Sequence, residues 1–351
     1  MITVNRKSFQ LGLSRLKRAI GVTSELSILS KVWINRTAMM GTDLRNWVKV
    51  PILDDQGEEM DIGFDRCISY KELLALVGKL KGDTFDIELK ENNVEIVGGG
   101  VKAIIATFNS AEFPELPDVP DKSKMKELPA DFRVGAMHCM DHTSEDQARY
   151  FMTGVNIDGK MMVATDGRRM ALYEMDIEMD TALISKPTLE IFLGMDLNLY
   201  LIDEQNIWFS GLDGVIRGGL IEGKFPNYER VRPQGTPDVE CELTAEAISG
   251  SDVIKLFKNG TDSMRVFILL NDGILQMKSN NDHGEVIFSH ELESYDGEEV
   301  TFYMNYQYLM DAMKDDVMDL KLYDVRDVDG SPKIVLSAGK YSSTIMGMVR
   351  E

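Results

Sequence analysis

The chain repeats one short phrase, and this repeat limits the fold more than any single residue does. The stretch that begins Phe113-Pro114 returns 112 residues later as Phe225-Pro226. A second pair precedes it in the same order, because Met40-Gly41-Thr42-Asp43-Leu44 is echoed by Val163-Ala164-Thr165-Asp166-Gly167. A fainter third copy lies at 271–280. The spacing predicts three tandem copies of one fold, which we place at residues 1–122, 123–240 and 241–351.

Within each third, the apolar pattern alternates between helical and strand periods. In the first helical stretch, Phe9, Leu13 and Leu16 fall on one face. About two helices and several short strands per copy, separated by tight turns, indicate an α+β fold with antiparallel sheets. The expected helices are 8–20, 69–80, 133–147, 187–195, 244–258 and 305–314. The expected strands are 85–89, 93–97, 103–108, 151–157, 161–164, 171–175, 320–323, 333–337 and 341–349.

The composition is that of an ordinary globular chain without a membrane segment. Hydrophobic residues make up 44% of the sequence, yet no apolar run approaches the roughly 18 residues that a membrane span needs. The first seven residues are typical of a strand entering a helix, not of a signal peptide. Cys67, Cys139 and Cys241 are scattered and form no metal or disulfide pattern, so we expect a cytoplasmic protein.

The net charge of −20 is unevenly distributed. Lys and Arg minus Asp and Glu give −1 for residues 1–125, −9 for 126–240 and −10 for 241–351. A global excess of acid argues against a nucleic-acid binder, whose usual footprint is basic. A global count does not detect a basic inner face beneath an acidic outer one, however.

Several local motifs resemble chemical sites but lack a necessary part. His138 and His142 are four residues apart, yet Cys139 stands where a zinc-protease helix needs Glu, so a partly exposed helix surface is favoured. Asp329-Gly330 indicates a hairpin turn, not a calcium loop. The three glycines at 98–100 indicate a turn, because no Gly-Lys-Ser/Thr follows them. No catalytic constellation or cofactor motif remains, so we expect no enzyme.

Three blocks in the middle third carry a resemblance to a known family. They are Arg149-Tyr150-Phe151-Met152-Thr153-Gly154, the stretch 163–171, and the stretch 224–231. Together they resemble the bacterial DNA polymerase III beta subunit, the DNA sliding clamp. Smaller matches at Gly41-Thr42-Asp43-Leu44 and Met346-Gly347-Met348 extend the resemblance over essentially the whole chain.

The resemblance implies a ring of six domains, made by two chains joined head to tail. Helices would line the hole, through which double-stranded DNA passes without sequence-specific contacts. Such a protein is a non-enzymatic processivity factor. Its implied partners are a polymerase catalytic subunit, a clamp loader and a second copy of itself.

The resemblance also assigns residues to three surfaces. The residues matched to a cleft that binds partner peptides are Met152, Thr165, Gly167, Arg168, Arg169, Met170, Pro233, Thr344, Met346 and Met348. Those expected to face DNA are Lys7, Arg15, Lys17, Arg18, Lys71, Lys79, Tyr150, Lys186, Lys255 and Lys258. Those matched to the interface between chains are Ala103, Ile105, Leu256 and Phe257. One departure is the acidic stretch at 144–147, where the family often has neutral or basic residues that touch DNA.

Two other functions stay open at this point. A repeat scaffold without DNA binding would have the same three copies but would tolerate charge reversal of Arg15, Lys17 and Arg18. A carboxylate-dependent metal hydrolase is suggested only by the abundance of acidic residues, and it would require tight binding of a divalent metal.

Overall fold

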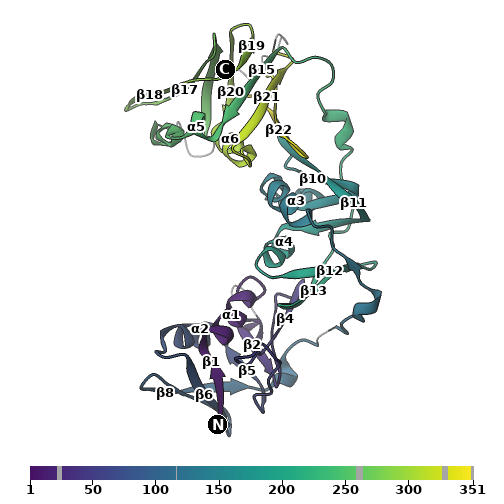
Figure 1. The fold of residues 1–351 in the computed structure, drawn as a ribbon, viewed down its shortest axis with the longest axis vertical. Helices are drawn as coiled ribbons and strands as arrows, with labels where there is room; N and C mark the ends of the chain where they lie inside the picture. Colours follow the sequence, from purple (N-terminus) through teal and green to yellow (C-terminus); the bar gives the residue numbers. More distant parts are fainter. Residues whose placement is uncertain (22–25, 116, 258–263, 326–330, 349–351) are drawn as a thin grey trace. The chain divides into compact units, whose positions relative to one another are not determined.

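The computed structural model describes residues 1–21, 26–115, 117–257, 264–325 and 331–348. These residues form two compact units, each built from separate stretches of the chain (Figure 1). Unit 1 comprises Met1–Leu128 and Ile184–Ile221, and unit 2 comprises Pro129–Leu183 and Glu222–Glu351. The middle third of the sequence therefore contributes to both units.

Unit 1 is a continuous antiparallel sheet of 12 strands with three α-helices among its described residues. The strand order is β1-β6-β7-β8-β5-β2-β3-β4-β14-β13-β12-β9. Its elements are β1 (Ile2–Asn5), α1 (Arg6–Leu16), β2 (Lys31–Asn35), β3 (Ala38–Thr42), β4 (Asn46–Pro51), β5 (Asp65–Ser69), α2 (Tyr70–Lys79), β6 (Thr84–Lys90), β7 (Asn93–Gly98), β8 (Val101–Phe108), β9 (Lys126–Glu127), α4 (Lys186–Leu193), β12 (Leu197–Ile202), β13 (Asn206–Gly211) and β14 (Gly214–Gly219).

Helix α1 shows why the first predicted helix forms. The Asn5 side chain caps it by accepting a hydrogen bond from the Ser8 amide at 3.0 Å. Phe9, Leu13 and Leu16 are all buried, as the apolar spacing predicted. Helices α1 and α2 lie side by side (Figure 1). The second helix is confirmed as well, because its periodic residues are buried while its lysines are exposed.

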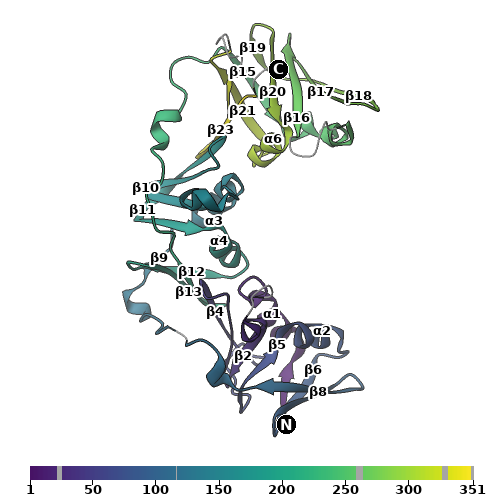
Figure 2. The same cartoon turned by 180° about the vertical axis from the view of Figure 1, so that it is seen from behind.

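Unit 2 has two sheets and short helices (Figure 2). The strand orders are β10-β11-β23-β22-β21-β15-β19 and β18-β17-β16-β20. Its elements are α3 (Phe132–Cys139), β10 (Gly154–Thr165), β11 (Arg169–Ser185, whose last two residues belong to unit 1), β15 (Val239–Thr244), α5 (Ala245–Ile248), β16 (Arg265–Asn271), β17 (Ile274–Asn281), β18 (Gly284–Glu291), β19 (Tyr295–Gly297), β20 (Val300–Asn305), α6 (Tyr306–Ala312), β21 (Val317–Tyr323), β22 (Lys333–Ala338) and β23 (Tyr341–Met346).

Two predicted helices are shorter than expected. The helix predicted at 133–147 ends at Cys139, and a 3₁₀ turn at Met140–His142 follows it. Thr143 ends the helical run by bonding back to the Met140 carbonyl, an alternative that short hydroxyl side chains offer the backbone. The helix predicted at 244–258 is divided by Gly250, whose φ of +81° is not helical, into α5 and a 3₁₀ stretch.

The expectation of a partly exposed helix surface at the two histidines is wrong for His142. His142 is completely buried, and its Nε2 lies 2.8 Å from the Ser343 hydroxyl. Cys139 is buried beside it, while the His138 side chain lies between Tyr173 and Tyr341. His142 is therefore part of the packed interior of unit 2, whereas His138 is only partly buried, with 12% of its side chain exposed.

The turn predictions are confirmed where the structure describes them. Gly99 and Gly100 join β7 to β8 with φ values of +57° and +81°, a conformation open to glycine. The hairpin predicted at 329–330 lies outside the described residues. None of the helices that the structure describes is both long and apolar enough to cross a membrane.

Candidate functional site

The two echoed motifs fold into the same turn. Thr42 donates its hydroxyl to the Asn46 carbonyl at 2.7 Å, and Thr165 donates to the Arg169 carbonyl at the same distance. In each turn the Asp that follows the Thr accepts two backbone N–H groups through Oδ1, at 2.9 and 2.6 Å in the first and at 2.8 and 3.1 Å in the second. The repeat in sequence therefore corresponds to one local structure built twice.

Each turn leads into a strand that pairs with a strand from later in the chain. In unit 1, β4 pairs with β14, with Asn46 opposite Gly218. In unit 2, β11 pairs with β23, with Arg169 opposite Ile345. The same hydrogen bond closes both arrangements, because Gly219 N donates to Arg45 O and Met346 N donates to Arg168 O, each at 2.9 Å. This register makes Trp47 equivalent to Met170, Arg217 to Thr344, and Gly219 to Met346.

The turn in unit 2 borders a cavity of about 260 Å³, which we call the cleft. Eight of the ten residues predicted for it line it, and the described lining does not include Pro233 or Met348. Met348 instead pairs with Tyr303 through a backbone hydrogen bond of 2.7 Å. Sequence reasoning missed one wall, although the repeated Phe-Pro phrase marks it. The cleft is lined by Met152, Thr165, Gly167, Arg168, Arg169, Met170, Pro226, Asn227, Tyr228, Val231, Thr344 and Met346.

The size of the side chain at one repeated position contributes to the open volume of the cleft. In unit 1, Trp47 is buried and packs edge-on against Phe113, with 6.1 Å between ring centroids. In unit 2, the equivalent Met170 packs with Val163 and Leu172, and Phe225 lies against this cluster. A flexible thioether occupies less volume than an indole and can move aside for a ligand. The replacement of Trp by Met is thus one reason why the turn in unit 2 borders an open cavity.

Arg169 supports the cleft as a structural brace. Its guanidinium lies 3.0 Å from Asp166 and 2.5 Å from Asp311, donates to the Asp141 carbonyl at 2.6 Å, and stacks on Tyr308. Burial alone would lower the pKa of Arg169, but the hydrogen bond to Asp311 and the charge of Asp166 outweigh it and raise that pKa. With its donors occupied, Arg169 fixes the turn. The neighbouring Arg168 is exposed and lines the cleft.

Tyr228 forms part of the wall that the sequence prediction omitted. Its hydroxyl donates to Asp158 at 3.2 Å. Burial, followed by the nearby Asp158 carboxylate, raises the pKa of Tyr228 to about 12. The phenol therefore remains protonated at neutral pH, and its hydrogen bond to Asp158 holds the ring against the apolar cluster of the cleft.

His142 lies behind the cleft and positions strand β23. Its partner Ser343 immediately precedes Thr344, which lines the cleft. Burial, with smaller contributions from the charges of Arg169 and Lys314, holds the pKa of His142 well below 6.5. The imidazole is therefore neutral at neutral pH, so it can bond Ser343 without adding a third positive charge to this region.

Several known proteins are similar to the chain in sequence or in fold. No protein-family model matches the chain. The beta sliding clamp of Vibrio cholerae is 24% identical over 332 residues, which cover 89% of each chain, and that of Treponema pallidum is 26% identical over 286 residues, or 76% of each. The beta subunit of Thermotoga maritima DNA polymerase III superposes with a TM-score of 0.83 at 18% identity, covering 100% of this chain and 99% of that one.

The chain is similar to the bacterial beta sliding clamps over most of its length. The predicted α+β clamp fold and the resemblance stated from the sequence are both confirmed by these comparisons. The names of these relatives describe a clamp and a polymerase subunit, in agreement with the prediction that the chain is not an enzyme.

The cations predicted to face DNA differ in their availability in unit 1. Lys7, Lys17, Lys71 and Lys79 are exposed, and Arg18 is about half exposed beside Glu190 at 3.2 Å. Arg15 departs from the prediction, because its side chain is only 14% exposed and pairs with Asp213 at 2.5 Å. Arg15 thus connects α1 to the β13–β14 turn, and it is not an open phosphate contact.

The remaining residues predicted to contact DNA also differ in their exposure and pairing. Lys186 is partly buried at the start of α4, and Tyr150 is half exposed. Lys255 pairs with Asp252 at 2.7 Å and lies over the ring of Tyr306. Lys258 lies outside the described residues.

The residues matched to the interface lie on or beside two open strand edges. Strand β8 pairs with β7 along its length but with β5 only at Thr107 and Phe108, and β18 is the last strand of its sheet. Ala103 and Ile105 are half-buried on β8, whereas Ile104 between them is 63% exposed. Leu256 is 73% exposed, and the 3₁₀ stretch that carries it and Phe257 contacts β18.

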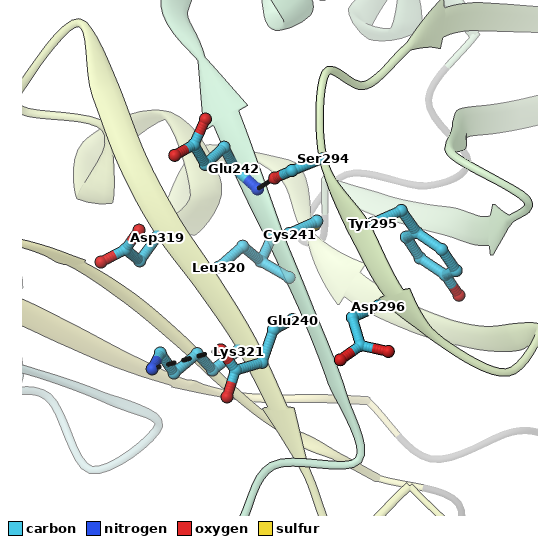
Figure 3. Close-up of a pocket in the computed structure, with 9 residues that line it drawn as sticks. All are labelled: Glu240, Cys241, Glu242, Ser294, Tyr295, Asp296, Asp319, Leu320 and Lys321. Carbon is cyan, nitrogen blue, oxygen red and sulfur yellow. Dashed lines mark hydrogen bonds and ion pairs between the residues drawn. The ribbon is translucent and has the colours of Figure 1, made fainter.

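A second hollow, of about 370 Å³, lies on the sheet formed by β15, β19 and β21 (Figure 3). Its carboxylates spread apart instead of pointing to one centre, and Glu240 pairs with Lys321 at 3.5 Å. Across the described parts of the chain, no group of three or more His, Cys, Asp or Glu side chains is arranged to hold a metal ion. The hollow therefore gives no support to a metal hydrolase.

Proposed function

We propose that two copies of this chain close head to tail into a ring around duplex DNA, and that the cleft tethers a polymerase catalytic subunit or the clamp loader. The observation that carries this proposal is the cleft itself. One repeated turn is filled by Trp47, while its copy, with Met170, borders an open cavity with mostly apolar walls. A concave apolar site with a few fixed polar groups is typical of a binding site.

Three domains per chain fit this assembly, with boundaries at residues 1–122, 123–240 and 241–351. The two copies of the turn support this division, because the strand that follows each turn pairs with a strand near the end of the next third. We also place the protein in the cytoplasm, where its proposed partners act on DNA.

Contact with DNA would come from exposed cations, not from the acidic surface as a whole. The exposed candidates in unit 1 are Lys7, Lys17, Arg18, Lys71 and Lys79, and the partly buried Lys186 would add to them. Tyr150 and Lys255 would add to them in unit 2. Such contacts reach phosphates, so binding should be independent of sequence and weaken steeply with salt. Arg15 is left out because its side chain is largely buried against Asp213.

Closure of the ring would join the free edge of β8 to that of β18 in a second copy. Both strands show the same alternation of exposed and partly buried residues. An exposed edge readily adds another strand through its unpaired backbone groups. Lys102 on β8 and Glu285 and Glu291 on β18 provide opposite charges. Ala103, Ile105, Leu256 and Phe257 would then supply apolar contact.

A processivity assay on primed circular DNA tests the proposal. Wild type should be dimeric by sedimentation and should lengthen the products of a cognate polymerase. Ile104→Asp combined with Leu256→Asp should give monomers without this effect, whereas Ile177→Asp, at another exposed apolar position, should change neither result. A wild-type chain that is monomeric at micromolar concentration and does not stimulate the polymerase would overturn the proposal.

A further inference from the structure

Strand β7 carries a carboxylate that is almost completely buried. The Glu95 side chain is only 9% exposed, and a charged group is rarely buried to this extent without a partner. Its two oxygens are satisfied separately, because Oε1 accepts from Lys90 at 3.0 Å and Oε2 accepts from Lys102 at 2.9 Å. Glu95 is therefore a buried charge with two cationic partners.

The register of the sheet brings the two lysines to Glu95 from opposite sides. Glu95 lies directly opposite Glu88 on β6 and Ile104 on β8. Lys90 follows Glu88 by two residues and Lys102 precedes Ile104 by two, so these side chains share one face of the sheet. Each lysine is thus a diagonal neighbour of Glu95, within reach of a long side chain. The Lys102 side chain consequently extends back over β7, away from the free edge of β8.

The free edge of β8 is where this pairing has a consequence. Among the described residues, β5 pairs with β8 only at Thr107 and Phe108, which leaves one side of residues 101–106 open. Ile104 is 63% exposed on this stretch, whereas the charge of Lys102 is neutralised within its own chain. The bond to Lys102, followed by the bond to Lys90, lowers the pKa of Glu95, so at neutral pH Glu95 remains ionised and Lys102 remains paired.

Within unit 1, the buried carboxylate contributes little to stability. Glu88 and Glu95 are like charges directly opposite each other, which is unfavourable, and Lys90 already bridges them at 3.3 and 3.0 Å. Apolar residues can often replace a buried ion pair without loss of stability. A carboxylate at position 95 therefore indicates a role beyond the stability of the sheet, and the side chain that it controls at the free edge is Lys102.

We propose that Glu95 is a positioning residue for closure of the ring. It holds Lys102 against its own sheet and neutralises it, so that β8 presents Ile104, and not a free cation, to the second copy. The inference rests on the proposed function of β8 as a closing edge and adds the residue that prepares this edge.

Sedimentation equilibrium of the full-length chain tests this role through the dissociation constant of the dimer. Glu95→Gln leaves Lys102 without its counter-charge beside an edge that closure removes from water, so the dimer should weaken about tenfold or more. Glu95→Gln combined with Lys102→Met removes the cation as well and should return the dissociation constant to within about threefold of wild type. A purely structural loss would not be rescued in this way. Urea unfolding checks that unit 1 of each variant is folded.

A single change at Lys102 keeps the test decisive even if Glu95→Gln does not fold. Lys102 is 60% exposed, and Lys102→Met leaves Glu95 paired with Lys90, so the dimer should weaken by less than about threefold. A tenfold loss in Lys102→Met would show that Lys102 serves the second copy directly and would overturn the inference. Glu240→Gln, which alters the Glu240–Lys321 pair of another sheet, is the matched control and should leave the dimer unchanged.

The remaining outcomes separate this inference from the proposed function. A wild-type dimer with an equally tight Glu95→Gln dimer would overturn the positioning role and leave ring closure standing. A double variant as weak as Glu95→Gln alone would also overturn it. A monomeric wild type would overturn ring closure, and this inference with it.

Discussion

The turns at Thr42–Asn46 and Thr165–Arg169 share their hydrogen bonds but not their surroundings. In unit 1 the position after the turn holds Trp47, and the facing strand holds Gly219. In unit 2 these positions hold Met170 and Met346, both of which line the cleft. The comparison shows that the repeated backbone fixes where a site can form, while a few side chains decide whether that place is filled or open.

The two turns also differ in how they are braced. In unit 1, Asn46 donates to Asp43 at 3.0 Å and accepts the Thr188 hydroxyl at 2.6 Å, so one buried amide links neighbouring segments. In unit 2, the equivalent Arg169 links Asp166 and Asp311 and stacks on Tyr308. The turn beside the cleft is thus stabilised by the longer and charged Arg169 side chain, which can hold the walls of the cleft apart without filling it.

Replacing Arg169 and Asn46, which stabilise the two turns, should give the largest losses of stability. Arg169→Met leaves Asp166 and Asp311 without their cation in a largely buried place and should destabilise unit 2 by about 3–5 kcal/mol. Asn46→Leu leaves the buried Thr188 hydroxyl without its acceptor and should destabilise unit 1 by about 1–3 kcal/mol. Urea unfolding measures the loss of stability in each variant. Hydrogen exchange detected by mass spectrometry shows which unit has become less stable. Equal costs for the two variants would contradict the contrast between charged and neutral braces.

Exchanging the residues that fill or open the two turns should come next. Trp47→Met removes most of a buried ring and should cost unit 1 about 2–3 kcal/mol through the cavity it leaves. Met170→Trp should cost unit 2 less than about 1.5 kcal/mol, because an indole can enter the existing cleft, while peptide binding falls by about tenfold or more. Denaturant unfolding and peptide titration measure these effects. A Met170→Trp variant that still binds peptides at wild-type affinity would show that Met170 does not control the opening.

The buried histidine of unit 2 should make stability depend on pH. Because the pKa of His142 in the folded state lies well below the unfolded value near 6.5, the unfolded state binds the extra proton first. Stability should therefore fall as pH drops below about 6.5, by up to about 1.4 kcal/mol per pH unit from this group. His142→Asn should flatten the dependence between pH 6.5 and 5, measured by urea unfolding. His283→Asn, at an exposed position, is the control, and an unchanged slope in His142→Asn would refute the assignment.

The sequence predicted the repeated frame but only part of the cleft. Periodic apolar residues and the Thr-Asp turns depend on neighbours within a few positions, so α1, α2 and both turns could be anticipated. The wall formed by Tyr228 and Val231 could not, because its side chains reach the cleft through tertiary packing against β11. His142 was missed for the same reason, since Ser343 lies 201 residues away.

The sequence also did not reveal which charged side chains form ion pairs. Arg15 follows the same pattern along α1 as Lys17 and Arg18, yet Asp213 from the β13–β14 turn neutralises it. The partner lies in a distant segment, so a helical pattern gives no sign of it. A count of cations on one helix face therefore overestimates the contacts available to DNA.

The smallest expected effects come from the third residue of each turn. Leu44 and Gly167 both adopt positive φ, at +76° and +88°, where only glycine is free of strain. Leu44→Gly should change unit 1 by no more than about 1 kcal/mol, because relief of strain offsets the added freedom of the unfolded chain. Gly167→Ala should destabilise unit 2 by about 1 kcal/mol and displace Arg149, since the new carbon would lie 3.0 Å from its Nη atom. Thermal unfolding measures the loss of stability, and titration of a peptide that binds the cleft measures the effect on binding. If Gly167→Ala lowers stability but leaves peptide affinity unchanged, the position of Arg149 beside Gly167 does not matter for the cleft.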